Sequence, residues 1–102
     1  MPFLRLSWGK LKPGTWDEFE KHYNEHVAPK ASTVKGLQIR GLLPSTDTPD
    51  EGLSLTMWDT MDDMRNYELS GEIPANVSQV EHLFTGEYWV KHFEIVSAAK
   101  PE

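Results

Sequence analysis

Two aromatic side chains, Trp58 and Tyr67, lie nine residues apart in the stretch LTMWDTMDDMRNYE (55–68). Trp58 ends a strand pattern, and Tyr67 falls about two and a half helical turns beyond the residue that caps the next predicted helix. Large aromatics dominate the cores of small domains, which favours a structural role for both. In a functional interpretation, the two rings wall a cleft and the Tyr67 hydroxyl holds a phenol or a ketone. The interpretations are compatible, because a pocket wall is often core on its other side.

His22 and His26 are spaced i, i+4 on a predicted helix, beside Glu18 and Glu25. This spacing puts both imidazoles on one helix face, where they could share a metal ion. A third ligand would have to come from elsewhere, and the chain has no HExxH pattern. We therefore expect no metal site and interpret both as solvated or capping histidines. A position at a pocket edge is the alternative for His26.

Two further histidines are isolated in the sequence. His82 lies near a predicted helix end, where a positive charge is favoured, and His92 lies on the last predicted strand. Either could act as a general base if it opened onto a pocket, although neither has an orienting partner nearby in the sequence. Structural roles are favoured for both, and His82 is kept as a catalytic candidate.

Three charged residues share the more polar side of their predicted strands: Arg5, Arg40 and Glu94. The favoured interpretation is a cross-strand charge network. In the alternative, an arginine stabilises an oxyanion on a substrate.

Composition makes several kinds of chemistry unexpected. The 102 residues include no cysteine, so there is no disulfide, no thiolate nucleophile and no cysteine-ligated metal. No Gly-rich phosphate loop or nucleophile elbow is present. The formal charge is −6 and the basic residues are scattered, so we expect neither nucleic acid nor a membrane as a partner. Without cysteine or a signal-peptide pattern, a cytoplasmic location is expected.

The first third of the chain predicts a strand and a helix. FLRLSWGKL (3–11) alternates apolar and polar residues, as a half-buried strand does. After Pro13-Gly14, Thr15 and Glu18 match a capping box at the start of a helix. The apolar stripe of that helix comprises Trp16, Phe19, Tyr23 and Val27. Pro29 predicts that the helix kinks or ends there.

The middle of the chain predicts a hairpin and a second helix. Strands over 36–44 and 51–60 are separated by the turn-rich 45–52, which favours direct antiparallel pairing. Asp59 or Thr60 is expected to cap the next helix. Its expected inner stripe is Met61 and Met64, with Tyr67 as a further candidate.

The last third predicts one more strand. SGEIPANV (70–77) should interrupt the second helix, and a final helical turn or two should pass through Val77, Val80, Leu83 and Phe84. Gly86 should end that segment. EYWVKHFEIV (87–96) is the fourth strand, and we expect one domain over 1–97 with a frayed tail over 98–102.

The order of elements, β-α-β-β-α-β, predicts an α+β, ferredoxin-like fold, in which helices cover one face of a four-stranded antiparallel sheet. The sequence leaves open which strand face meets the helices. The uncovered face carries either an apolar set or a mixed set, and the mixed set comprises Arg5, Arg40 and Trp58. A large exposed apolar patch usually marks an interface, so we expect a homodimer that associates through its sheet faces.

The chain resembles the dimeric α+β barrel superfamily, and most closely its antibiotic biosynthesis monooxygenase type. The resemblance rests on FLRLSWGKLKPG, TWDEFE, LTMWDT followed by DDMRNYELSGE, and EYWVKHFEIV, and it covers nearly the whole chain. YNEHVAP also resembles the EthD-like branch. The resemblance implies oxygenation of an electron-rich aromatic substrate, of quinol or anthrone type, without metal or flavin.

A related branch of the superfamily degrades haem. This chain departs from the residue pattern expected for that branch, so haem degradation is disfavoured here. Haem degraders are expected to carry Asn, Trp and His where this chain has Ser7, Tyr67 and approximately Val77.

These considerations predict a cofactor-independent monooxygenase. Tyr67 and His82 are the catalytic candidates, and the substrate-binding candidates are Ser7, Trp58, Tyr23 and His26. The alternative is a non-catalytic dimeric module that binds a small ligand. An EthD-like role would favour His26 over Tyr67.

Overall fold

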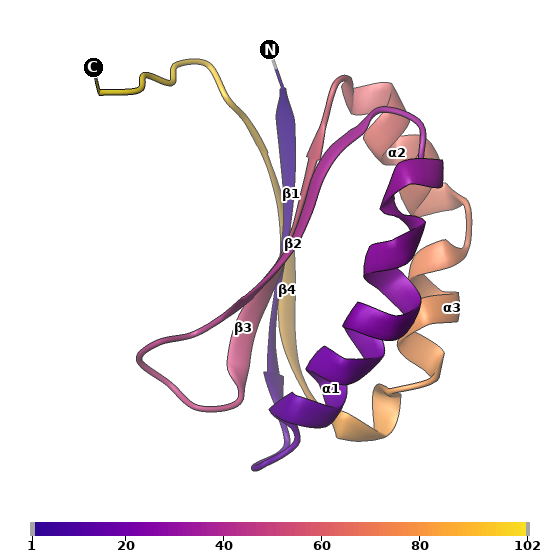
Figure 1. Ribbon diagram of the computed structural model, residues 1–102, viewed down its shortest axis with the longest axis vertical. Helices are drawn as coiled ribbons and strands as arrows, with labels where there is room; N and C mark the ends of the chain where they lie inside the picture. The colour runs from indigo at the N-terminus through magenta and orange to yellow at the C-terminus, as the bar shows by residue number, and fades with distance from the viewer. Residues whose placement is uncertain (1, 102) are drawn as a thin grey trace.

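In the computed structural model, which describes residues 2–101, four strands form one antiparallel sheet in the order β2-β3-β1-β4. The strands are β1 (Phe3–Leu11), β2 (Leu37–Pro44), β3 (Glu51–Trp58) and β4 (Phe84–Glu94). The helices α1 (Trp16–His22), α2 (Met61–Leu69) and α3 (Glu72–Ser78) all lie on one side of this sheet (Figure 1). The predicted ferredoxin-like architecture is confirmed.

The mixed polar side of the strands faces the helices. Arg5 of β1 donates a hydrogen bond to Glu68 of α2, and Thr56 is the cross-strand partner of Arg5. The opposite side of the sheet is apolar and has no helix over it. Its central members are the cross-strand pairs Leu4–Met57, Leu6–Leu55 and Trp8–Leu53. The strand pattern leaves open which sheet face meets the helices, and the tertiary structure shows that it is the mixed polar face.

The start of α1 differs from the predicted capping box. Thr15 donates its hydroxyl hydrogen to the carbonyl of Lys12 and caps nothing with its side chain, and Glu18 makes no return bond. Instead, Asp50 in the β2–β3 turn accepts a hydrogen bond of 3.4 Å from the backbone N–H of Trp16. A carboxylate distant in sequence thus occupies the place of the local cap.

The helical segment after α1 is longer than predicted and changes type twice. Residues Tyr23–Val27 form a π-helical turn, and Ala28–Thr33 form a 3₁₀ helix. Pro29 was expected to kink or end the helix near it, and the π-helical turn does end at Val27. The chain nevertheless continues as a 3₁₀ helix, in which Pro29 lies in the first turn, where its missing N–H has no helical partner to lose.

Thr60 caps α2 as predicted, since its side chain accepts a hydrogen bond of 3.1 Å from the backbone N–H of Asp63. Met64 and Tyr67 are buried, but Met61 is 37% exposed and does not belong to the inner stripe. Steps of three residues drift by about 60° around an α-helix, so Met61 lies roughly 120° away from Tyr67.

The second helix is interrupted at Ser70-Gly71, within the predicted 70–77, but the rest of this segment forms a third helix, α3. Gly71, at φ 85°, separates α2 from α3. Pro74 is the third residue of α3, within the first turn that tolerates proline. A 3₁₀ turn follows at Glu81–Leu83, and β4 then begins at Phe84, so Gly86 lies inside the strand and does not precede it.

The centre of the core is formed by Trp58, Met64 and Tyr67, with Leu37 and Ile73 packed against them. After β4 the chain continues without regular structure and projects, like the β2–β3 turn, from the uncovered side of the sheet (Figure 1). None of the helices within residues 2–101 has the length and apolar character needed to span a bilayer.

Candidate functional site

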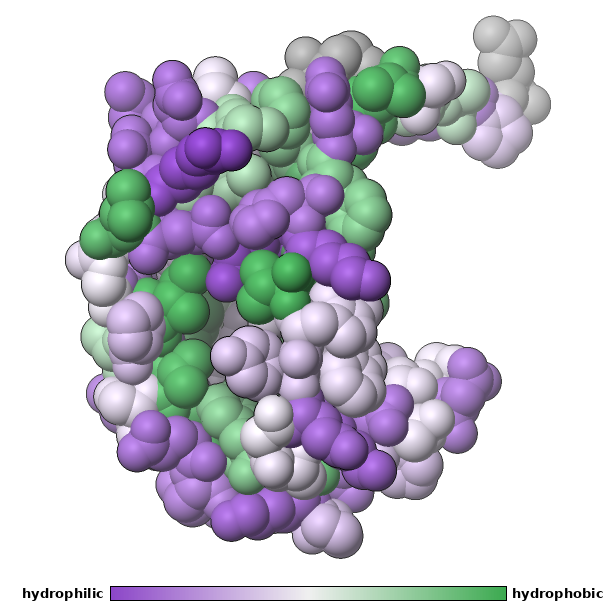
Figure 2. All heavy atoms as spheres, turned by 180° about the vertical axis from the view of Figure 1, so that it is seen from behind, coloured by the Kyte–Doolittle hydropathy of each residue, from purple (hydrophilic) through white to green (hydrophobic). Residues whose placement is uncertain are grey.

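A cavity of about 500 Å³ lies between the sheet and the helices. All four strands contribute to its wall, together with α1, the π-helical turn, α2 and α3. In Figure 2, hydrophobic atoms gather around a hollow between the two layers. The size and the mainly apolar, aromatic lining are typical of a small-molecule site. Lining side chains that matter for its chemistry are Arg5, Ser7, Trp16, His22, Tyr23, Arg40, Thr56, Tyr67 and Asn76.

Arg40 and Tyr67 form a polar pair in the cavity wall. Nη2 of Arg40, on β2, donates a hydrogen bond of 2.6 Å to the hydroxyl oxygen of Tyr67, on α2. Nη1 of the same guanidinium donates to the carbonyl of Val27 at 3.3 Å. The two partners come from opposite layers, so only the tertiary fold brings them together.

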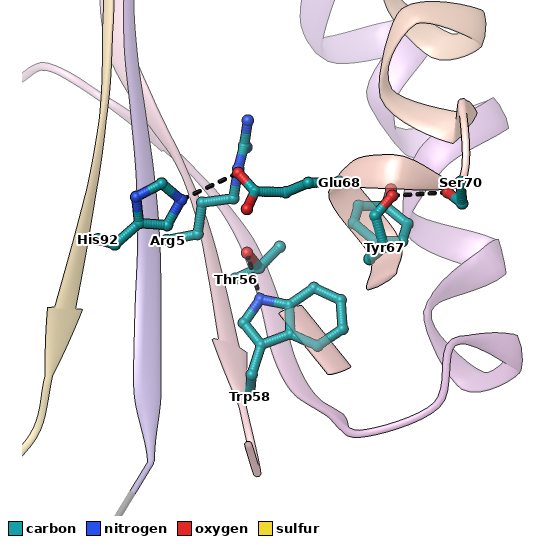
Figure 3. Close-up of polar contacts among 7 residues, drawn as sticks. All are labelled: Arg5, Thr56, Trp58, Tyr67, Glu68, Ser70 and His92. Atoms are coloured by element: carbon teal, nitrogen blue, oxygen red, sulfur yellow. Dashed lines mark hydrogen bonds and ion pairs between the residues drawn. The ribbon is translucent and has the colours of Figure 1, made fainter. Parts of the chain in front are cut away.

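Trp58 supports Tyr67 from behind and does not reach the cavity. Its ring is 0% exposed and packs against Tyr67 at a centroid distance of 5.2 Å. Its indole N–H donates to the hydroxyl of Thr56 at 2.9 Å, so the buried donor is satisfied (Figure 3). Trp58 is therefore core, and Tyr67 is both core and cavity wall.

Tyr23 extends into the cavity from the π-helical turn. It is 7% exposed, and its hydroxyl makes no hydrogen bond with any described residue. Burial raises the pKa of the Tyr23 hydroxyl, Arg40 partly opposes that effect, and Tyr67 adds to it. The hydroxyl therefore keeps its proton at neutral pH and can act as a donor.

A second polar cluster joins α2 to the sheet (Figure 3). One carboxylate oxygen of Glu68 accepts from Nε of Arg5 at 2.9 Å and lies 2.9 Å from Nε2 of His92. Burial raises the pKa of Glu68, but the hydrogen bonds from His92 and Arg5 outweigh burial and leave that pKa below its ordinary value. The predicted cross-strand network is thus a sheet-to-helix network, and Arg40 and Glu94 take part in none of the ion pairs within residues 2–101.

Three of the predicted site residues meet at the cavity: Ser7 from β1, Tyr23 and Tyr67. Two histidines lie elsewhere. The side chain of His26 is 54% exposed and lies 3.9 Å from Glu25. The side chain of His82 is 65% exposed and lies 3.1 Å from Glu18. Their predicted roles stay predictions, without a contact to the cavity that would support them.

His22 is the histidine in the cavity lining, and sequence reasoning did not single it out for that position. Its Nε2 lies 3.1 Å from the backbone carbonyl of Asn76 in α3, and its ring lies beside that of His26, with the centroids 5.1 Å apart and the planes tilted by 41°. The available signal was its spacing of three residues from Phe19 on the apolar stripe. Within residues 2–101, no three His, Asp or Glu side chains cluster as metal ligands.

Comparison with known proteins relates this geometry to solved structures. No protein-family profile and no curated protein sequence matches the chain. A protein from Caulobacter crescentus CB15, described provisionally as an antibiotic biosynthesis monooxygenase, is 17% identical, with 94% of this chain and 91% of that chain covered and a TM-score of 0.81. This chain has the fold of the antibiotic biosynthesis monooxygenase-like proteins.

Two further structures of this fold carry more specific descriptions. A variant of SnoaB, a cofactor-independent oxygenase from Streptomyces nogalater, is 14% identical, with 95% of each chain covered and a TM-score of 0.77. A variant of MhuD with two manganese protoporphyrin IX molecules per active site is 16% identical, with 97% of this chain and 99% of that chain covered and a TM-score of 0.78. At such identities the likeness establishes the fold alone, and it confirms the fold that the resemblance implied.

Proposed function

We propose that the protein is a cofactor-independent monooxygenase that acts on a small electron-rich aromatic substrate of quinol or anthrone type. The observation that carries the proposal is the apolar cavity of about 500 Å³ with the Arg40–Tyr67 pair in its wall. The name of SnoaB, a cofactor-independent oxygenase of the same fold, supports it.

In the proposed reaction, the substrate loses a proton and its anion reacts with O₂. One oxygen atom enters the product as a carbonyl and the other leaves as water. The hydroxyl of Tyr67 accepts its hydrogen bond from Arg40, so the phenolic hydrogen of Tyr67 is available to the substrate oxygen. Such donors stabilise developing negative charge most strongly where water is excluded.

We assign proton acceptance to His22. A carbonyl oxygen can only accept, so the contact with Asn76 makes Nε2 of His22 a protonated nitrogen, and in the neutral imidazole Nδ1 then has the lone pair. His82 was the catalytic histidine expected from the sequence, and its pairing with Glu18 on the surface does not support that role.

Oxygen uptake by the purified protein tests the proposal, with anthrone and a panel of hydroquinones and without added metal or flavin. Protein-dependent uptake well above autoxidation is expected. Binding of these compounds without uptake would contradict it and would favour the alternative, a non-catalytic module that binds a small ligand. An EthD-like role would favour His26 over Tyr67, but the exposed side chain of His26 lies outside the cavity lining.

We also propose that the protein is a homodimer in which the uncovered sheet faces meet, and that it resides in the cytoplasm. Large apolar side chains remain exposed on that face, among them Ile39 (52%), Leu43 (41%) and Phe93 (46%). Burying such a patch against its own copy would remove it from water.

A further inference from the structure

The cavity contains a positive charge that no carboxylate neutralises. Three cationic side chains line it, and two of them are paired: Arg5 with Glu68 at 2.9 Å and Lys10 with Glu87 at 3.9 Å. Arg40 appears in none of the ion pairs within residues 2–101. Its guanidinium bonds only neutral oxygens, the Val27 carbonyl and the Tyr67 hydroxyl, among the described residues. A cation in a mainly apolar cavity is costly unless an anion joins it.

Two buried polar atoms in the cavity lining have no hydrogen-bond partner within the described chain, and both can donate. They belong to the hydroxyl of Tyr23 and the indole N–H of Trp16. Tyr67 already accepts from Arg40 and so has a hydrogen left to donate. Buried polar groups are normally satisfied, so the donors of Tyr23 and Trp16 lack an acceptor that a ligand can supply.

One negatively charged oxygen of a ligand could therefore both neutralise Arg40 and accept hydrogen bonds from the free donors. We propose that the cavity recognises its ligand through an ionised oxygen, which Arg40, Tyr23 and Tyr67 hold together. The chemical class is an aromatic carboxylate or the oxyanion of a phenol or enol, with the rings in the apolar part of the cavity. This inference rests on the proposed ligand-binding role of the cavity, but not on the reaction with oxygen.

The geometry explains why these three residues act together. Arg40 supplies a permanent charge, because a guanidinium does not deprotonate in proteins. Arg40 and Tyr67 are both close enough to Tyr23 to affect the pKa of its hydroxyl, which stays protonated. Hydrogen bonds to a charged acceptor are roughly twice as strong as neutral ones, so an oxyanion gains more here than a ketone or an ether oxygen does.

The test compares three probes of one size under argon: 2-naphthoate, 2-naphthol and the neutral 2-naphthalenemethanol. Binding to the full-length protein is followed by calorimetry. We expect 2-naphthoate to bind at least about tenfold more tightly than the neutral alcohol. Equal affinity of the unmodified protein for 2-naphthoate and for the neutral alcohol would by itself overturn the proposal.

Variants assign the preference to residues. Arg40→Gln should weaken 2-naphthoate binding by about tenfold or more and weaken binding of the neutral alcohol by a smaller factor, so that the preference for the anion shrinks. Arg40→Lys keeps the charge and should retain part of the preference, which covers the case in which Arg40→Gln does not fold. A full preference in folded Arg40→Gln would overturn the proposal.

Titration of bound 2-naphthol distinguishes the two sources of the anion. A bound pKa below that of the free naphthol identifies the phenolate as a ligand, whereas an unchanged value beside tight 2-naphthoate binding identifies the carboxylate. Either result supports the ionised-oxygen site. The binding measurements are made without oxygen, so they do not depend on the proposed reaction. If the protein prefers anions under argon but consumes no oxygen in air, only the monooxygenase proposal is refuted.

Discussion

The indole of Trp58 lies behind the phenol of Tyr67, with the ring centroids 5.2 Å apart and the planes inclined by 40°. Trp58 is completely buried, whereas Tyr67 also reaches the cavity. One aromatic is therefore structural, and it holds the other at the wall where its hydroxyl meets Arg40. Substitutions at the two positions should have different consequences.

Tyr67→Phe should lower turnover by about tenfold to a hundredfold, because it removes a donor placed for the substrate oxygen, and it should leave the fold intact. Oxygen uptake with anthrone measures the first effect and thermal unfolding the second. His82→Gln provides the comparison and should change turnover by less than about twofold, since the exposed His82 pairs with Glu18 at the surface and lies outside the cavity lining. Unchanged kinetics in Tyr67→Phe would remove Tyr67 from the mechanism.

Thr56→Val should destabilise the protein by about 1–3 kcal/mol, because it leaves the buried indole N–H of Trp58 without its acceptor. Urea unfolding monitored by fluorescence measures the loss. Thr48→Val makes the same chemical change at an exposed turn residue and should have little effect. Equal effects at the two positions would mean that the Trp58 hydrogen bond contributes nothing measurable.

Gly52→Ala should destabilise the fold by about 1–3 kcal/mol, because the added methyl group has no space. A Cβ at Gly52 would overlap the ring of Trp16 and lie 2.6 Å from the carbonyl oxygen of Leu43. Gly9, the cross-strand partner of Gly52, is the matched control, because a Cβ there would meet no atom within 4 Å. Urea midpoints that fall equally in both variants would contradict this packing.

Glu68→Gln should lower the free energy of unfolding at neutral pH by about 1 kcal/mol. The pKa of Glu68 in the folded protein lies below its ordinary value of 4.5, so the carboxylate stabilises the fold above that pH. This contribution disappears as the pH falls through the pKa of Glu68 in the folded protein, because Glu68 is then protonated in both the folded and the unfolded state.

The difference between wild type and Glu68→Gln should therefore shrink below a pH of about 4.5. Urea unfolding on both sides of this value measures it. Glu94→Gln, an exposed carboxylate outside the described ion pairs, is the control. If the difference in unfolding free energy between wild type and Glu68→Gln instead grew on acidification, the Arg5–Glu68–His92 cluster would not stabilise the fold through an ionised Glu68.

Leu55→Lys should convert the proposed dimer to a monomer, because it puts a charge in the middle of the apolar sheet face beside Leu6. Light scattering coupled to size-exclusion chromatography gives the mass. Leu69→Lys makes the same change on α2, where the side chain is 85% exposed, and should leave the mass unchanged. A wild-type protein of monomer mass at all concentrations would refute the dimer.

Local patterns were sufficient for the presence of four strands, for the bounds of β1 and for one helix cap, whereas β4 begins at Phe84, three residues before its predicted start. Alternation over 3–11 predicts β1 with its observed bounds, because period-two patterning is a property of the strand itself. Thr60 caps α2 through a bond to a residue three positions later, so the whole interaction is visible in the sequence. By contrast, the cap of α1 comes from Asp50, more than thirty residues away, and local rules name the wrong residue.

The sequence by itself determined the order of elements, the antiparallel sheet and the aromatic pair at Trp58 and Tyr67, because each depends on patterning over a few residues. Tertiary structure alone decided which sheet face meets the helices, and with it which side chains share a cavity. Arg40 and Tyr67 are 27 positions apart and come from opposite layers, so no local spacing predicts their contact. Their meeting depends on the packing of α2 over the sheet, a long-range free-energy balance that short sequence patterns do not encode.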